Sequence, residues 1–239
     1  MKMFLWRYKK NSIGIGWIVG KRVCGRFNAN MRYGLLALML FCINVSAQEA
    51  ESSRTILFYG DSLTAGYGLD REQAFPALVQ ARIDSLGWNF EVFNAGLSGE
   101  TSAGGLRRID WLMRRPVDVF VLELGANDGL RGIDLKDTRS NLQQIINRVK
   151  AKNPNISLVV VGMQMPPNLG AEYTEEFQRL FPGLAKENGA ALVPFLLEGV
   201  ADRPELNLSD GNHPTVEGHR IVAETVWATL GPVLEALRR

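Results

Sequence analysis

The chain has 239 residues and a formal net charge of +2, but this charge is unevenly distributed. Residues 1–47 carry eight basic side chains and no acidic one, which leaves residues 48–239 with 19 basic and 25 acidic residues and a net charge of −6. An acidic body argues against a nucleic-acid-binding protein, which needs a clustered basic face.

The first 47 residues have the layout of a secretory signal peptide. Their basic residues precede a nearly continuous apolar run over residues 33–45, and Val45-Ser46-Ala47 then offers the small residues of a cleavage site. The apolar run is short for a membrane span, which needs about 20 residues. We expect residues 1–47 to be a signal peptide with an extended basic n-region, and residues 48–239 to be exported, to the periplasm. Retention as an N-terminal anchor and a start at Met31 stay open as alternatives.

Both cysteines, Cys24 and Cys42, lie in this N-terminal segment. Residues 48–239 therefore offer no disulfide, no thiol nucleophile and no cysteine-ligated zinc. Their length suits one domain with a full hydrophobic core. We expect this domain to be monomeric and to contain no membrane span.

Strands and helices are predicted to alternate along residues 48–239. Short apolar runs predict strands, and apolar residues at spacings of three and four predict amphipathic helices. The predicted elements are strand 55–59, helix 72–86, strand 89–94, helix 102–113, strand 117–124, helix 138–152, strand 156–163, helix 175–188, strand 191–195 and helix 216–230. Residues 95–101, 125–129 and 166–170 are predicted loops. This order predicts an α/β fold with parallel strands and helices on both faces of the sheet.

A serine follows the first predicted strand. The strand stops at Gly60, and Asp61-Ser62-Leu63 come next, ahead of a glycine-rich segment. A hydroxyl just past the carboxyl end of a strand lies where α/β sheets usually place ligands. A Gly-Asp-Ser sequence alone is most often a turn, so Ser62 is a candidate nucleophile only if the chain also supplies a base, an acid and oxyanion donors.

The base for this serine must be His213 or His219, the two histidines of the chain. His213 is favoured because it lies in a turn-rich loop that can direct the ring over the sheet edge, whereas His219 is expected on the surface of the last helix. Asp210 precedes His213 by three residues, a spacing at which its carboxylate can reach the ring Nδ1–H. Asp61 and Asp128 are the alternative acids, and Asp61 is interpreted as shaping the serine turn.

Two loops after neighbouring predicted strands offer oxyanion donors. Gly99 can present its backbone N–H, because glycine lets a substrate approach the main chain closely. Asn127 can present its side-chain amide. Each also has a simpler explanation, a plain turn at Gly99 and an Asx-turn at Asn127.

Four sequence blocks, taken in order, resemble the SGNH (GDSL) hydrolase family over nearly all of residues 48–239. The blocks are Gly60-Asp61-Ser62-Leu63-Thr64-Ala65-Gly66-Tyr67, Asn94-Ala95-Gly96-Leu97-Ser98-Gly99-Glu100-Thr101-Ser102, Leu122-Glu123-Leu124-Gly125-Ala126-Asn127-Asp128-Gly129-Leu130-Arg131-Gly132 and Asp210-Gly211-Asn212-His213-Pro214. The chain looks closest to the periplasmic multifunctional thioesterase, lysophospholipase and arylesterase subgroup. It departs from that subgroup at Ala126, where glycine is common.

The resemblance implies a flavodoxin-like three-layer α/β/α sandwich with a five-stranded parallel sheet, and neither metal nor cofactor. It implies Ser62 as nucleophile, His213 as base and Asp210 as the orienting acid. The implied oxyanion donors are the backbone N–H groups of Ser62 and Gly99 and the side chain of Asn127. The implied reaction is hydrolysis of carboxylic esters and thioesters, such as aryl esters, lysophospholipids and acyl-CoA, by way of an acyl-enzyme.

Two other functions stay open. A carbohydrate or peptidoglycan O-acetylesterase on the same fold would favour a wide groove with exposed aromatic side chains, of which only Tyr67 and Tyr173 stand out. A non-enzymatic flavodoxin-like binding module would need a phosphate-binding glycine pattern, which Gly60, Gly66 and Gly68 do not form.

The loop over residues 163–170 is apolar, as is Leu130 beside the oxyanion loop. An apolar lining with few polar groups suits an acyl chain or an aryl ester. Ordinary core packing of Met163 and Met165 explains the same composition equally well.

Overall fold

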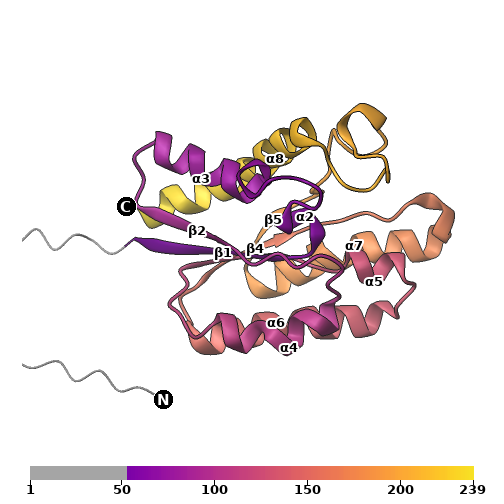
Figure 1. Ribbon diagram of the computed structural model, residues 1–239. Helices are drawn as coiled ribbons and strands as arrows, with labels where there is room; N and C mark the ends of the chain where they lie inside the picture. The colour runs from indigo at the N-terminus through magenta and orange to yellow at the C-terminus, as the bar shows by residue number, and fades with distance from the viewer. Residues whose placement is uncertain (1–52) are drawn as a thin grey trace, which may run out of the picture. The chain divides into compact units, whose positions relative to one another are not determined.

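The computed structural model describes residues 53–239, whose helices and strands are shown in Figure 1. The signal peptide predicted over residues 1–47 and the alternative start at Met31 lie outside the described residues. Among the described helices, none is long and apolar enough to cross a membrane.

A five-stranded sheet forms the middle layer. Its strands are β1 (Arg54–Gly60), β2 (Phe90–Asn94), β3 (Val119–Glu123), β4 (Ser157–Val161) and β5 (Ala191–Val193). They are arranged in the order β2-β1-β3-β4-β5, and every neighbouring pair is parallel. The predicted five-stranded parallel sheet is confirmed.

Helices cover both faces of this sheet, as Figure 1 shows. One layer holds α3 (Phe75–Ser85) and α8 (Val216–Leu237), which pack against each other, and the opposite layer holds α4 (Ser102–Leu112), α6 (Leu135–Lys152) and α7 (Ala171–Asn188). Because both faces are covered, β3 is buried along its whole length and reads as a continuous apolar run up to its last residue, Glu123. The three-layer α/β/α prediction is confirmed.

Short helices lie in the connections. These are α2 (Ser62–Ala65), η2 (Arg71–Gln73), α5 (Ala126–Leu130), η3 (Pro167–Leu169) and η4 (Pro204–Leu206). The prediction of a loop at residues 125–129 was wrong, because most of these residues belong to α5. The helix forms against the rest of the protein: a Cβ atom on Gly129 would lie 2.3 Å from Met165 Sδ and 2.8 Å from Phe177 Cε2, so glycine favours this close packing of α5.

The last helix is also longer than the predicted range of 216–230. It continues through Pro232, which lacks a backbone N–H, and ends at Leu237. Leu230 and Leu234, four residues apart, are both fully buried. Their burial on one helix face favours the additional turns over the break that proline would otherwise cause.

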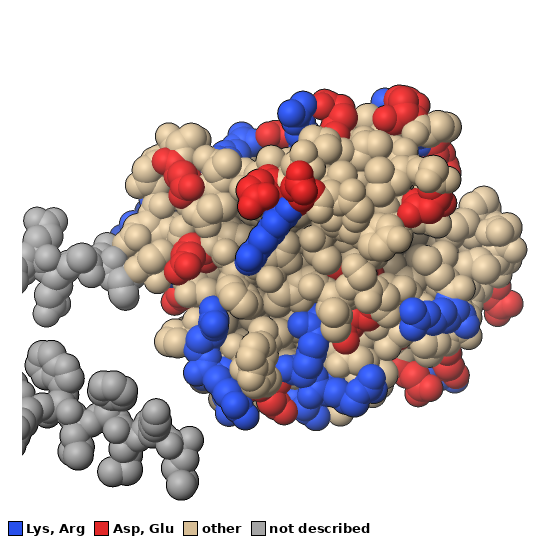
Figure 2. All heavy atoms as spheres, viewed as in Figure 1, with Lys and Arg blue, Asp and Glu red and all other residues tan. Residues whose placement is uncertain are grey.

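Charged side chains of both signs are spread over the visible surface in Figure 2, with several Lys and Arg side chains together over α4 and α6. Exposed ion pairs such as Arg139–Glu187 and Arg148–Asp110 join neighbouring elements there. Such pairs each contribute about 0–1 kcal/mol, so the apolar core accounts for most of the stability.

His219 is buried rather than exposed, which corrects the prediction for this residue. Only 1 % of its surface is accessible. Its Nδ1 accepts a hydrogen bond of 3.1 Å from the backbone N–H of Phe75, at the start of α3. Its Nε2 is buried without a hydrogen-bond partner within the described part of the chain. The ring therefore joins α8 to α3 in its neutral form.

Burial lowers the pKa of His219 from 6.5 to about 4, and the charge of His213 adds to this effect. The unfolded chain binds a proton at this residue below about pH 6.5, whereas the folded chain does not until about pH 4. The free energy of unfolding should therefore fall as the pH decreases through this window, by up to about 3 kcal/mol from this residue.

A His219→Gln variant should lack this contribution. Urea denaturation at about pH 7 and about pH 4.5 measures it as the difference in pH dependence between wild type and variant. Equal pH dependence in both proteins would show that the buried imidazole is not an acid-sensitive element.

Candidate active site

The candidate residues gather at the carboxyl edge of the sheet. Because β1 lies between β2 and β3, the loops after these three strands start side by side. The first loop carries Ser62, the second Gly99 and the third Asn127. Figure 1 shows α2, which begins with Ser62, at the end of β1.

The turn after β1 is closely packed. Asp61 is the N-cap of α2, and its Oδ1 accepts a 3.0 Å hydrogen bond from the backbone N–H of Leu63. A Cβ atom on Gly60 would lie 2.1 Å from Thr64 Oγ1 and 2.4 Å from Glu123 Oε2, so only glycine fits before the turn. The interpretation of Asp61 as a turn-shaping residue agrees with these contacts.

Ser62, His213 and Asp210 form a continuous chain of hydrogen bonds. Ser62 Oγ lies 2.8 Å from His213 Nε2, and His213 Nδ1 lies 2.7 Å from Asp210 Oδ2. An ionised carboxylate can only accept, so the Nδ1 position carries the ring proton. The Nε2 lone pair is thereby left to accept the serine hydroxyl.

Asp210 is held as a carboxylate by its own loop. Its Oδ1 accepts hydrogen bonds from the backbone N–H groups of Asn212 at 2.9 Å and His213 at 3.1 Å. The Asn212 bond, followed by the bond from the His213 side chain, lowers the pKa of Asp210 to about 2. The acid therefore stays ionised at neutral pH and fixes the tautomer of the histidine.

The loop that carries Asp210 and His213 is closed at its base. Asn207 and Pro214 form an antiparallel bridge, and the Leu208 N–H donates to the His213 carbonyl at 2.7 Å. This closure directs the histidine toward the sheet edge, as expected for a loop residue.

Tyr67 is a neighbour of His213, although the sequence suggested it only as an exposed aromatic side chain of a possible sugar-binding groove. The two rings lie 4.5 Å apart between centroids at an angle of 38°. Tyr67 follows Gly66, whose left-handed conformation ends α2 and turns the chain back toward the histidine. The only signal in the sequence was an aromatic residue five positions after the serine.

Gly99 lies in an open, left-handed conformation with φ of 78°. Arg131 lies beside it, and its Nη2 donates to the Gly99 carbonyl at 3.1 Å. Nothing covers the position of a Cβ atom on Gly99 more closely than 3.7 Å. The backbone of this loop is thus accessible to a ligand.

The Gly99 loop and the end of β2 before it are anchored to the serine turn by hydrogen bonds to its backbone carbonyls. Asn94 Nδ2 donates to the Thr64 carbonyl at 2.8 Å, and the Leu97 N–H donates to the Gly60 carbonyl at 3.0 Å. A Cβ atom on Gly96 would lie 2.3 Å from the Ala65 nitrogen. The two loops therefore pack backbone against backbone.

Asn127 is brought to the same turn by a side-chain contact. Its Nδ2 donates to Asp61 Oδ2 at 3.1 Å. The amide has two N–H groups, so one remains for a ligand after this bond is made. Asn127 therefore contacts the serine turn. The simpler explanation, a local Asx-turn, does not include this contact.

Asp128, one of the alternative acids, has a different environment. It is fully buried and accepts hydrogen bonds from Ser102, from the backbone N–H at 2.8 Å and from Oγ at 2.5 Å. Ser102 begins α4, so Asp128 joins α5 to the amino end of that helix. Neither Asp128 nor Asp61 forms a hydrogen bond to a histidine among the described contacts.

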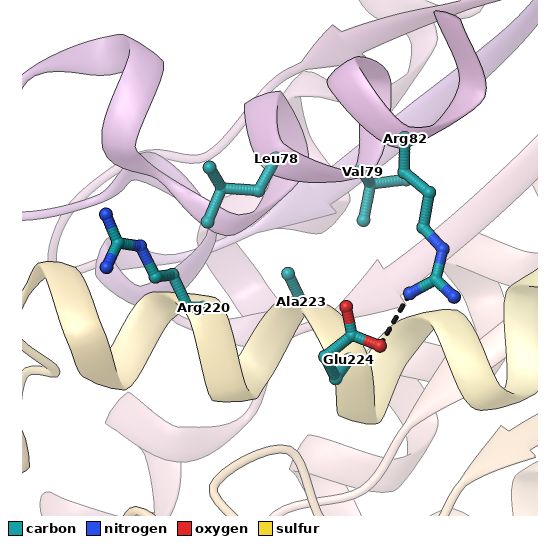
Figure 3. Close-up of a pocket in the computed structure, with 6 residues that line it drawn as sticks. All are labelled: Leu78, Val79, Arg82, Arg220, Ala223 and Glu224. Carbon is teal, nitrogen blue, oxygen red and sulfur yellow. Dashed lines mark hydrogen bonds and ion pairs between the residues drawn. The ribbon is translucent and has the colours of Figure 1, made fainter. Parts of the chain in front are cut away.

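A separate hollow lies between α3 and α8, shown in Figure 3. It encloses about 130 Å³ and is lined by Leu78, Val79, Arg82, Arg220, Ala223 and Glu224. The ion pair between Arg82 and Glu224 joins the two helices at one end of it. None of the candidate site residues lines this hollow.

Comparison with known proteins identifies the family and supports the fold. Esterase TesA of Pseudomonas aeruginosa is 40% identical over 84% of this chain and 96% of its own. Thioesterase 1/protease 1/lysophospholipase L1 of Escherichia coli K12 is 37% identical over 87% of this chain and 97% of its own.

The structure of the psychrotrophic esterase EstA from Pseudoalteromonas sp., inhibited by monoethylphosphonate, superposes with a TM-score of 0.72. It is 32% identical in sequence, and the match covers 77% of this chain and 100% of that one. Residues 58–221 match the sequence profile of the GDSL-like Lipase/Acylhydrolase family. The chain therefore belongs to the GDSL-like lipase and acylhydrolase family.

Proposed function

We propose that this protein is a serine hydrolase that cleaves carboxylic esters and thioesters through an acyl-enzyme on Ser62. The observation that carries the proposal is the hydrogen-bond chain from Ser62 through His213 to Asp210, with distances of 2.8 Å and 2.7 Å. A serine needs an adjacent base, and the base needs an orienting acid, to act as a nucleophile at neutral pH.

In the first step, Ser62 Oγ attacks the substrate carbonyl carbon while His213 Nε2 accepts the hydroxyl proton. Asp210 stabilises the imidazolium through the Nδ1–H bond. The tetrahedral oxyanion accepts hydrogen bonds from the backbone N–H groups of Ser62 and Gly99 and from the amide of Asn127. Ser62 begins α2, so its N–H belongs to the helix-initial groups that have no partner within the helix.

The intermediate collapses when the carbonyl re-forms and the bond to the leaving group breaks. The alcohol or thiol leaves with the proton from His213, and the acyl group remains as an ester of Ser62. A water molecule then attacks this ester while His213 accepts its proton. Collapse of the second intermediate releases the carboxylic acid and restores the serine.

The rim of the site supports an apolar acyl or aryl group as substrate. Among residues 53–239, four of the six exposed large hydrophobic side chains lie in the connections at this edge: Tyr67, Leu97, Leu130 and Leu169. Met163 is buried in the core, so the core-packing explanation holds for it. Tyr173 directs its hydroxyl to the Gly129 and Ile133 carbonyls, which supports a structural role over stacking on a sugar.

Replacing Ser62 with alanine should lower kcat/KM for a p-nitrophenyl ester by at least about 1,000-fold, because the nucleophile is lost. His213→Ala should show a similar loss. His219→Gln is the matched control, since it changes the other histidine, which does not contact Ser62. A comparable loss in the control, with folding intact by circular dichroism, would mean that the base has been misassigned.

A substrate series tests the acyl preference. We expect kcat/KM for p-nitrophenyl esters to rise from acetate to medium-length chains, because each buried methylene contributes about 0.8 kcal/mol. Palmitoyl-CoA should also be hydrolysed. A strong preference for an acetylated sugar would instead favour the O-acetylesterase alternative.

We further propose that residues 1–47 direct export to the periplasm and that residues 48–239 form the mature, monomeric enzyme. The basic start, the apolar run and Val45-Ser46-Ala47 support this proposal. Expression of the full chain followed by mass spectrometry of the periplasmic fraction should detect a product starting at Gln48. A membrane-bound product that retains the segment would favour the anchor alternative.

A further inference from the structure

Two acidic side chains lie buried beneath the serine turn, and the mechanism above uses neither for proton transfer. Asp61 and Glu123 are only 1 % and 2 % exposed. Glu123 ends β3, directly opposite Gly60 in the ladder between β1 and β3. Carboxyl groups are almost never buried this deeply without specific partners.

Glu123 holds the serine turn from below. Its Oε2 accepts a hydrogen bond of 3.2 Å from the Asp61 backbone N–H and one of 2.7 Å from Thr64 Oγ1. The absence of a side chain at Gly60 allows this close approach, because a Cβ atom there would lie 2.4 Å from Oε2.

The bond from the Asp61 backbone N–H to Glu123 Oε2 brings the two carboxyl groups close together, and a hydrogen bond with the Glu123 side chain is among the effects that lower the pKa of Asp61. Two ionised carboxylates can only accept, so a bond between the two side chains requires a proton on one of them. Asp61 is the better supported anion. Burial raises the pKa of Asp61 to about 6, but hydrogen bonds from the Leu63 N–H and Asn127 and the charge of His213 oppose this rise, so Asp61 is mainly ionised at neutral pH.

Glu123 has no comparable support for a charge. Burial, and then the charge of Asp61, raise its pKa well above the usual range. Arg108 of α4, which reaches the serine turn by donating to the Gly60 carbonyl, forms its ion pair with Glu100. Asp128 of α5 is bonded to Ser102. The shared proton therefore resides on Glu123.

We propose that Glu123 is a positioning residue that acts as a neutral acid: it donates to Asp61, and Asp61 in turn orients the Asn127 amide toward the substrate oxygen. The proposal rests on the function proposed above. Asp61 fixes the rotation of the amide by accepting one of its two N–H groups, which directs the other toward the developing oxyanion. A donor so fixed stabilises the transition state more than the bound substrate.

The Glu123→Gln variant tests the neutral form. A carboxamide keeps an acceptor for the Asp61 N–H and Thr64 and a donor for the Asp61 carboxylate, but it cannot ionise. We expect Glu123→Gln to retain most of the wild-type kcat. Glu123→Ala should lose up to about 100-fold in kcat with little change in KM, because a misplaced oxyanion donor affects the transition state.

The proton itself can be observed by infrared spectroscopy. The wild-type protein at neutral pH should show the carbonyl band of a buried protonated carboxylic acid, and Glu123→Gln should lack it. This readout is independent of activity and remains available if Glu123→Ala fails to fold. Absence of the band in the wild type, or its survival in Glu123→Gln, would overturn the proposal.

The kinetic outcomes separate this inference from the proposed function. If folded wild-type protein and Glu123→Gln both fail to hydrolyse every ester and thioester tested, the proposed function is wrong. If the wild type is active and Glu123→Gln loses as much kcat as Glu123→Ala, a charged Glu123 is required and the inference is wrong. Wild-type kcat in both variants would show that Glu123 positions nothing.

Discussion

The parallel pairing of β1 with β2 on one side and β3 on the other is the constraint on which the candidate site depends. Its register sets Phe58 opposite Asn94 and Gly60 opposite Glu123, so the three strands end at one edge of the sheet. Adjacent strands lie about 5 Å apart. Loops that are distant in sequence therefore start within hydrogen-bonding reach of the serine turn. The closed loop before α8 brings His213 to the same edge.

Two features of the packing at that edge are energetically unfavourable, and a sheet edge without a functional site would be expected to lack them. Gly60 and Gly96 leave no room for a Cβ atom, and two acidic groups are buried together. Burying a carboxyl group is costly unless it is hydrogen-bonded or neutral. Such departures from ordinary packing are expected where a protein positions reactive groups. A neutral Glu123, as proposed above, lowers the free-energy cost of this burial and holds the serine turn in place.

Sequence patterns predicted the order and type of all the long elements, because core-facing periodicity is strong in buried strands and amphipathic helices. They failed where tertiary contacts override local preference. Residues 125–129 look like a loop, yet they begin α5, in which Gly129 packs closely against Met165 and Phe177. His219 looked exposed on a helix, yet it is buried against Phe75. Nothing in a one-dimensional pattern shows which helix face another helix will cover.

The sequence by itself determined the fold class, the family resemblance and the short list of reactive residues, because these depend on residue types and on their order along the chain. Only the tertiary structure decided which of these residues contact one another. It brought Ser62 within 2.8 Å of His213 across 151 positions in the chain, and it placed the Tyr67 ring beside that histidine at a tilt. It also buried Glu123 against the serine turn. These contacts depend on strand order and loop closure, which local sequence does not encode.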